Sequence, residues 1–258
     1  MPTVSRSLAF VHADPPPFER VEAAGRPAVL VVCDHASAVI PARYGDLGLG
    51  ADVRRSHVAW DIGAAEVARR LAVLLGAPAV LSGVSRLVID CNRPLGDPGS
   101  IPAATCGVAV PGNAAVDGAE ARSRADTWFR PYHSAIANSL DRLRRPGRPP
   151  AVVSVHSFTP VLAEHPRPWH VGVLWNRDAR LAVPLMARLA ERPGVVVGDN
   201  QPYSGREINY TLDTHAGAAG LPHVSVELRQ DLVADAVGAA RWAELLAEVL
   251  APLLPVRS

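Results

Sequence analysis

The chain has 258 residues, of which 48% are hydrophobic and 20% are charged, so it can bury one sizeable core. Its 26 basic and 25 acidic residues leave a formal charge of +1, which provides no general attraction for a polyanion and argues against binding to nucleic acid. Every basic residue is an arginine. The absence of lysine from the sequence excludes Schiff-base and Ser–Lys mechanisms.

The N-terminal residues and the cysteines indicate the cellular compartment of the protein. Residues 1–17 contain only a short apolar patch before three prolines, which is too short for a secretory signal, and no stretch reaches the ~20 apolar residues of a membrane span. The three cysteines, Cys33, Cys91 and Cys106, show neither zinc-knuckle nor disulfide spacing. We therefore expect a cytoplasmic protein that does not bind membranes, with an N-terminal tail at 1–19 and one domain at 20–258. The oligomeric state is not predicted.

Apolar runs alternate with amphipathic stretches along the rest of the chain, which is typical of an α/β domain in which helices flank a sheet. The predicted strands lie at 28–33, 87–90, 151–155, 171–175, 195–197 and 223–226. The predicted helices lie at 62–76, 117–145, 178–191 and 234–250. Two segments rich in proline, glycine and asparagine, 94–111 and 199–220, are predicted to be long loops.

Three of the predicted strands lead directly into side chains capable of metal or acid–base chemistry. Asp34 and His35 follow the first strand, His156 follows another, and Glu227 follows the last. Because ligands bind at the carboxyl ends of strands in open α/β sheets, these side chains are expected to converge. Asp61 stands where the helix at 62–76 begins, and its position fits either a helix N-cap or a metal ligand.

Two imidazoles and one carboxylate with a fourth position open form the ligand set of catalytic zinc. We therefore predict that His35, Asp61 and His156 hold one Zn²⁺, with Glu227 as the general base that activates water and protonates the leaving amine. A Ser–His pair at 156–157 is excluded, since adjacent residues of an extended chain point to opposite faces.

Seven short motifs occur in order along the chain: CDHAS at 33–37, HVAWDIGA at 57–64, SRLVIDCNR at 85–93, PYH at 131–133, SVHSFTP at 154–160, DNQPY at 199–203 and VELRQDL at 226–232. Together, from about residue 30 to 245, they resemble the N-formylglutamate amidohydrolase family. This resemblance implies a catalytic domain with a single-domain α/β fold similar to the zinc-dependent exopeptidase (phosphorylase/hydrolase-like) fold. It also implies hydrolysis of a small N-acyl amino acid, typically N-formyl-L-glutamate to formate and L-glutamate.

A more distant likeness bears on the metal ligands. Zinc amidases that cleave muramoyl-alanine bonds carry a His, a carboxylate, a second His and a Glu in the same order as His35, Asp61, His156 and Glu227. In this chain the second ligand is the shorter Asp instead of Glu, so Asp34 remains the alternative carboxylate ligand.

A glutamyl substrate carries two carboxylates, which guanidinium groups bind in a bidentate manner. Arg86 and Arg93, on either side of the predicted strand at 87–90, and Arg229, two residues after Glu227, are the predicted partners. Asn92 either donates to a substrate carbonyl or closes a turn. His133 is either an oxyanion stabiliser, a donor to a ligand carboxylate or a helix-surface histidine.

Two rival functions remain open. A non-catalytic protein that senses or carries an N-acyl amino acid would keep the fold but use neither a metal nor Glu227. A peptidoglycan-type zinc amidase would require export, and the absence of a recognisable signal peptide argues against it.

Overall fold

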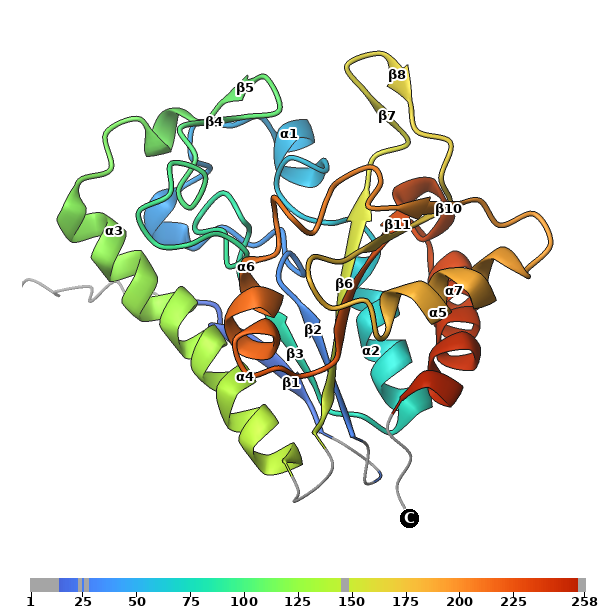
Figure 1. The fold of residues 1–258 in the computed structure, drawn as a ribbon. Coiled ribbons are helices and arrows are strands. Elements are labelled where there is room, and N and C mark those ends of the chain that lie inside the picture. The colour runs from blue at the N-terminus through green and yellow to red at the C-terminus, as the bar shows by residue number, and fades with distance from the viewer. Residues whose placement is uncertain (1–13, 23–24, 26–27, 145–148, 255–258) are drawn as a thin grey trace, which may run out of the picture.

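A computed structural model describes residues 14–22, 25, 28–144 and 149–254. Within these residues the main sheet has seven strands in the order β1–β3–β2–β6–β11–β9–β10 (Figure 1). The strands are β1 (Phe18–Val21), β2 (Val29–Cys33), β3 (Ala79–Ser82), β6 (Ala151–Phe158), β9 (Val171–Leu174), β10 (Val197–Asp199) and β11 (His223–Arg229).

The four central strands β3, β2, β6 and β11 run parallel, whereas β1 pairs antiparallel with β3, and β9 pairs antiparallel with β11. The central strands are buried along nearly their whole length, as expected for runs of β-branched residues covered on both faces. As a result, the carboxyl ends of four parallel strands meet at one edge of the sheet.

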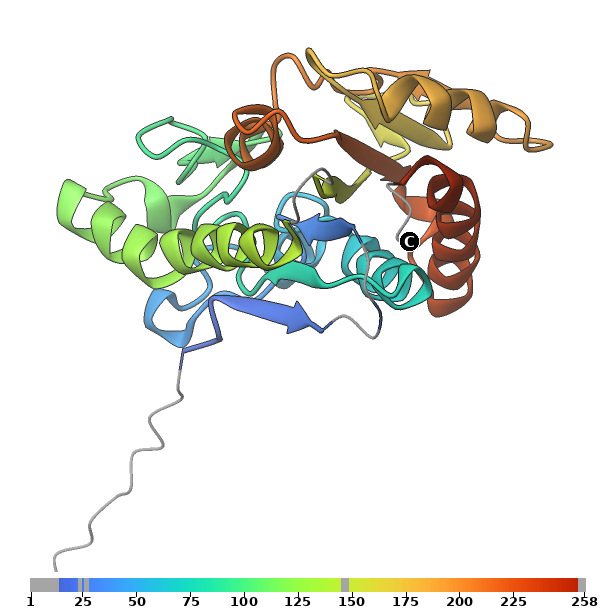
Figure 2. The same ribbon diagram turned by 60° about the horizontal axis from the view of Figure 1, so that its bottom comes forward.

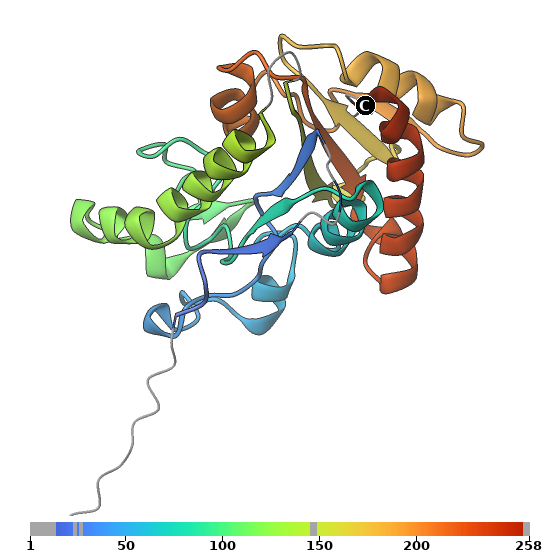
Figure 3. The same cartoon turned by 90° about the horizontal axis from the view of Figure 1, so that it is seen from below.

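Helices cover both faces of the sheet, as the view from below shows (Figure 3). One layer consists of α2 (Ala64–Leu75), α5 (Ala182–Ala190) and α7 (Ala236–Leu250). The other consists of α3 (Gly118–Arg124), a π-helical turn (Ala125–Phe129) and α4 (Arg130–Leu143). Alternate residues of each strand face the two layers, so Val29 and Val31 pack with α2 while Leu30 and Val32 pack toward α4.

The connections at the carboxyl end of the parallel strands are long and carry small elements of their own (Figure 1). They include the helices α1 (Ala51–Arg55) and α6 (Tyr210–Leu212), and the hairpins β4 (Ala104–Thr105)–β5 (Val108–Ala109) and β7 (Val161–Leu162)–β8 (His165–Pro166). Figure 2 shows β1 and α5 at opposite ends of the sheet. The parallel strands therefore lie in the middle of the molecule.

The predicted fold class, a single-domain α/β sheet flanked by helices, is confirmed. The predicted helix at 117–145 is present with a π-helical turn inside it and Asp117 as its N-cap, and its expected end at 145 lies outside the described residues. Residues 1–13 of the predicted tail also lie outside them, and β1 begins within the tail, at Phe18. None of the helices among the described residues is long and apolar enough to cross a membrane.

Three expectations about local structure were wrong. Residues 87–90 form a turn followed by irregular structure instead of a strand. The hydroxyl oxygen of Ser85 accepts from the amide of Leu87, and the carbonyl of Ser100 accepts from the amide of Asp90. The segment at 199–220 contains α6 and a π-helical turn, and the segment at 94–111 contains the β4–β5 hairpin. Strands β6 and β11 extend three residues beyond their predicted ends, so His156 and Glu227 lie within strands.

Candidate active site

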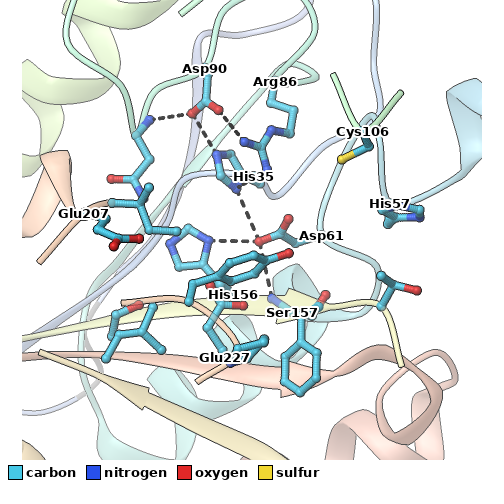
Figure 4. A pocket seen from close by; sticks show the side chains of 18 of the residues that line it. His35, His57, Asp61, Arg86, Asp90, Cys106, His156, Ser157, Glu207 and Glu227 are labelled. Carbon is cyan, nitrogen blue, oxygen red and sulfur yellow. Dashed lines mark hydrogen bonds and ion pairs between the residues drawn. The ribbon is translucent and has the colours of Figure 1, made fainter. Parts of the chain in front are cut away.

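A cavity of about 460 Å³ opens at the carboxyl edge of the sheet (Figure 4). Its walls come from the residues after β2, from residues 57–61 and 86–93, from the end of β6, from residues 200–208 and from β11. Its volume is within the range typical of small-molecule sites.

Three buried side chains from separate segments meet in this cavity: His35 after β2, Asp61 before α2, and His156 in β6. One ligand atom from each lies within 4.8 Å of the other two. The Oδ2 atom of Asp61 is 3.3 Å from Nδ1 of His35 and 2.9 Å from Nδ1 of His156. The structure thus brings together the three side chains that the sequence predicted as metal ligands.

Backbone hydrogen bonds fix the position of Asp61. Its amide donates to the carbonyl of His35 over 3.0 Å, and its Oδ2 accepts from the amide of Ser157 at 3.3 Å. The alternative interpretation of Asp61 as a helix N-cap is wrong, because the N-cap of α2 is Gly63, in a left-handed conformation that glycine adopts readily. The carboxylate is therefore turned toward the two imidazoles.

Each imidazole forms a hydrogen bond to a second carboxylate through Nε2, the ring nitrogen that does not face Asp61. The Nε2 atom of His35 donates to Oδ1 of Asp90 at 2.8 Å, and Nε2 of His156 donates to Oδ2 of Asp34 at 3.1 Å. When the ring proton is on Nε2, the lone pair of a neutral imidazole is on Nδ1, which faces Asp61. Such carboxylate–histidine pairs are the usual support of histidine metal ligands.

Asp34 is the outer partner of His156, not a member of the three-residue group. Its carboxylate also accepts hydrogen bonds from the hydroxyls of Tyr132 at 2.9 Å and Thr211 at 2.6 Å. Burial raises the pKa of this carboxyl, but the hydrogen bond and charge of His156 outweigh that effect and lower the pKa to about 2. Asp34 therefore stays ionised and anchors the imidazole ring.

The charges in this group stabilise one another. Burial lowers the pKa of His156, but its hydrogen bonds to Asp34 and Asp61 outweigh this effect and raise the pKa well above its ordinary value. The pKa of Asp61 is lowered because the two imidazoles outweigh the effect of burial. A set of buried carboxylates that draws positive charge onto its imidazoles is a suitable environment for a cation.

Glu227 lies beside His156, since the two residues are paired in the register of β11 and β6. It is buried, and its Oε2 atom has no hydrogen-bond partner among the described residues. Burial is the main cause that raises the pKa of Glu227, to about 7. An unpaired buried carboxyl with a pKa near neutrality is suited to taking up and releasing a proton.

The predicted substrate-binding residues fall into two groups. Arg86, Asn92 and Arg93 line the cavity. Arg86 forms an ion pair with Asp90 over 2.7 Å, and Oδ1 of Asn92 accepts from the amide of Thr211 at 3.0 Å. For the side chain of Arg93, the described part of the chain provides neither a hydrogen bond nor an ion pair.

Arg229 and His133 are not brought to the cavity lining. Arg229 is held by an ion pair with Asp231 at 2.8 Å and by the carbonyls of the loop before β9. His133, on α4, donates from Nε2 to the carbonyl of Cys91 at 3.0 Å and accepts at Nδ1 from His215 at 2.8 Å. It therefore contacts neither a ligand carboxylate nor the open cavity.

Three residues that support the site were missed by the reasoning from the sequence: Asp90, Tyr132 and Thr211. Asp90 was assigned to the end of a strand that does not form, although a carboxylate within a motif that contains two arginines was a usable signal. Tyr132 and Thr211 reach Asp34 from residues 98 and 177 positions away in the chain, and no local pattern indicates such contacts.

The chain matches the model of the N-formylglutamate amidohydrolase family over residues 27–234. Among solved structures, a gene product from Agrobacterium tumefaciens is 39% identical, with a TM-score of 0.88 over 92% of this chain and 94% of that one. An N-formylglutamate amidohydrolase from Ralstonia eutropha JMP134 is 19% identical, with a TM-score of 0.62 over 90% of this chain and 95% of that one. Among curated protein sequences, no match was found.

The family match defines the class of the protein, a hydrolase that acts on amide bonds. Within that class, the chain belongs to the N-formylglutamate amidohydrolase family. The family was already indicated by the seven motifs, and this prediction is confirmed.

Proposed function

We propose that this protein is a zinc-dependent amidohydrolase that cleaves the amide bond of a small N-acyl amino acid. N-formyl-L-glutamate, hydrolysed to formate and L-glutamate, is the leading substrate. The observation that carries the proposal is the meeting of His35, Asp61 and His156 with the unpaired Glu227 in one cavity.

One Zn²⁺ would be held by Nδ1 of His35, Oδ2 of Asp61 and Nδ1 of His156. These atoms suit the ion, because two imidazole nitrogens and one carboxylate oxygen are a common ligand set of catalytic zinc. When bound, zinc acts as a Lewis acid on the substrate carbonyl and lowers the pKa of water. Asp90 and Asp34 keep the ring protons on Nε2, so that both Nδ1 atoms present lone pairs to the cavity.

Glu227 is the proposed general base. In this role its carboxylate takes a proton from the attacking water and then donates it to the nitrogen of the leaving amine. Burial raises the pKa of Glu227 to about 7 in the metal-free protein, and the charge of a bound zinc ion would lower it, so that the carboxylate is ionised and able to accept a proton at neutral pH. The buried, unpartnered Oε2 also favours catalysis over the rival binding function, for which this carboxyl would have no task.

Arg93, Asn92 and Arg86 are the proposed substrate-binding residues, because they line the cavity beside the histidines. Arg93 offers a full guanidinium fork to a substrate carboxylate. The Nδ2 group of Asn92 has no partner among the described residues and can donate to a carbonyl, whereas its Oδ1 accepts from the amide of Thr211. Arg86 positions Asp90, whose carboxylate supports His35.

The proposal is tested by assaying the zinc-supplemented protein with N-formyl, N-acetyl and N-succinyl amino acids and following release of the free amine. Turnover of at least one of these series is expected, with loss of activity after chelation and recovery on addition of zinc. If none is hydrolysed, the proposed function is wrong.

A further inference from the structure

Tyr203 lines the cavity from the loop between β10 and α6. It ends the motif DNQPY at 199–203. The side chain of Asn200 fixes this loop, because its Oδ1 accepts from the amide of Trp175 at 3.1 Å and from the amide of Gly205 at 2.9 Å. The loop that carries Tyr203 is therefore attached to the end of β9.

The same loop packs beside the proposed general base. Gly172 is paired with Glu227 in the register of β9 and β11. A Cβ added to Gly172 would collide with the carbonyl of Gln201 and would lie 3.4 Å from Cβ of Glu227. The lack of a side chain at position 172 thus allows the loop to lie against the strand next to Glu227, and Tyr203 and Glu227 line one cavity.

A buried arginine outside the cavity lining holds the hydroxyl of Tyr203. Nη1 of Arg167 donates to the phenolic oxygen at 3.1 Å, and the guanidinium carbon lies 4.9 Å from the centre of the ring. Arg167 also donates to the carbonyl of Thr159 at 3.5 Å, and within the described residues it has no carboxylate partner. Its positive charge is therefore presented to the phenolic oxygen without a counter-charge.

The proton of the Tyr203 hydroxyl has to point elsewhere, because arginine only donates and already occupies the oxygen. No acceptor for it is present in the described part of the chain, whereas the hydroxyls of Ser157 and Thr159 in the same wall donate to backbone carbonyls. Burial and then the charge of Glu227 raise the pKa of Tyr203, so the hydroxyl stays protonated at neutral pH. Tyr203 thus offers the cavity a hydrogen-bond donor.

We propose that Tyr203 is a catalytic residue whose hydroxyl donates a hydrogen bond to the acyl oxygen of the substrate, where negative charge develops as water adds to the acyl carbon. Arg167 is its positioning residue, because it orients and polarises the hydroxyl. Tyr203 keeps its proton throughout, and the proton of the water goes to Glu227. The inference rests on the proposed amidohydrolase function. It assigns to Tyr203 the oxyanion stabilisation that His133, outside the cavity lining, does not provide.

Tyr203→Phe keeps the ring and removes the hydroxyl. With an N-acyl amino acid that the zinc-loaded wild type hydrolyses, kcat should fall about 10- to 100-fold while KM stays near the wild-type value, because the hydrogen bond strengthens only in the transition state. Tyr44→Phe, at a partly buried tyrosine outside the cavity lining, is the matched control and should leave both constants unchanged. An unchanged kcat, or a change in KM alone, would overturn the inference.

Arg167→Met keeps an unbranched side chain and removes the cation. Its kcat should fall about tenfold in the wild-type background and much less in the Tyr203→Phe background, since a positioning residue acts through the hydroxyl. Arg167→Lys, which retains the charge, should recover part of the loss. A merely structural role would lower kcat by the same factor in both backgrounds, and that result would contradict the role of Arg167.

Binding measurements separate failure of this inference from failure of the proposed function. The ligands are N-phosphoryl-L-glutamate, whose tetrahedral phosphorus replaces the acyl carbon, and L-glutamate. Tyr203→Phe should weaken binding of the phosphoryl compound about tenfold or more and leave binding of L-glutamate unchanged. If the wild type hydrolyses no N-acyl amino acid, the proposed function is wrong and this comparison decides alone. Equal affinities of wild type and variant for the phosphoryl compound, or no binding to either, would overturn the inference.

Discussion

At the scale of single residues, the candidate site depends on how each imidazole is oriented. His35 and His156 both direct Nδ1 toward Asp61 and both bond a buried carboxylate through Nε2. The reasoning from the sequence identified the three central residues because each lies near the end of a predicted strand or the start of a helix. It could not identify Asp90 as the partner of His35, because that contact depends on the path of a turn.

Replacing Glu227 tests its proposed chemical role. Glu227→Gln keeps the size of the side chain but removes the base, so kcat is expected to fall about 10² to 10⁴-fold while zinc content stays at the wild-type level. Steady-state kinetics and metal analysis on the same preparation provide the measurement. Turnover near the wild-type rate, or loss of the metal, would refute the role of a general base.

His133 provides a prediction about pH. Burial lowers the pKa of this imidazole from 6.5 to about 4 in the folded protein. Between these two values the unfolded chain binds more protons than the folded one, so the free energy of unfolding falls as the pH is lowered from 6.5 toward 4.

Urea unfolding of the wild type and of His133→Gln across this pH range measures the effect. In the variant the free energy of unfolding should fall less steeply as the pH is lowered. The two slopes should differ by at most the contribution of one bound proton. Identical slopes for the two proteins would show that burial does not hold His133 neutral.

At the scale of elements, the strands carry the site residues and the loops above them complete it. Three of the four central strands, β2, β6 and β11, were recognisable as apolar runs rich in β-branched residues, and β6 and β11 place His156 beside Glu227 through their register. Strands β1 and β3 were not predicted, because four-residue runs produce little periodicity. The segment that carries Thr211 was predicted as loop, since its helical turns are short and packed by tertiary contacts.

Thr211 links α6 to the support of His156. Thr211→Val removes the hydroxyl that donates to Asp34 at 2.6 Å, and zinc affinity is expected to fall about tenfold or more, as for other outer partners of metal ligands. Thr211→Ser should retain the affinity because it keeps the hydroxyl. Thr214→Val, at an exposed position in the next turn, is the matched control, and competition with a chelating dye gives the affinities.

Gly63 sets the direction of the chain between Asp61 and α2. Its φ of +81° is a left-handed conformation, and an added Cβ would collide with the backbone carbonyl of Val233. Gly63→Ala should therefore lower the free energy of unfolding by about 2 kcal/mol or more.

Gly45→Ala distinguishes the steric clash with Val233 from the free-energy cost of a left-handed backbone conformation. Gly45 also has a positive φ, of +56°, but a Cβ added there would meet no other atom within 4 Å among the described residues, so only about 1 kcal/mol is expected. Chemical unfolding of both variants makes the comparison. Equal losses would mean that the contact with Val233 relaxes without cost.

At the scale of the whole molecule, the parallel centre of the sheet is what brings distant residues together. Strands β2 and β6 are neighbours, although more than a hundred residues separate His35 from His156 along the chain. The α/β pattern and the family were predictable from the sequence, because both depend on local runs and short motifs. The pairing of Arg86 with Asp90 was not, since it depends on the path of the turns that bring the two side chains together.

The central claim, that this sheet edge holds a catalytic zinc ion, is tested most directly by metal analysis. Protein purified without chelators is analysed for metal content, and hydrolysis of N-formyl amino acids is measured on the same sample before and after chelation. The account predicts one zinc per chain, loss of activity on its removal, and loss of both zinc and activity in His156→Ala. Turnover that persists in fully metal-free protein, or zinc retained at full stoichiometry by His156→Ala, would contradict it.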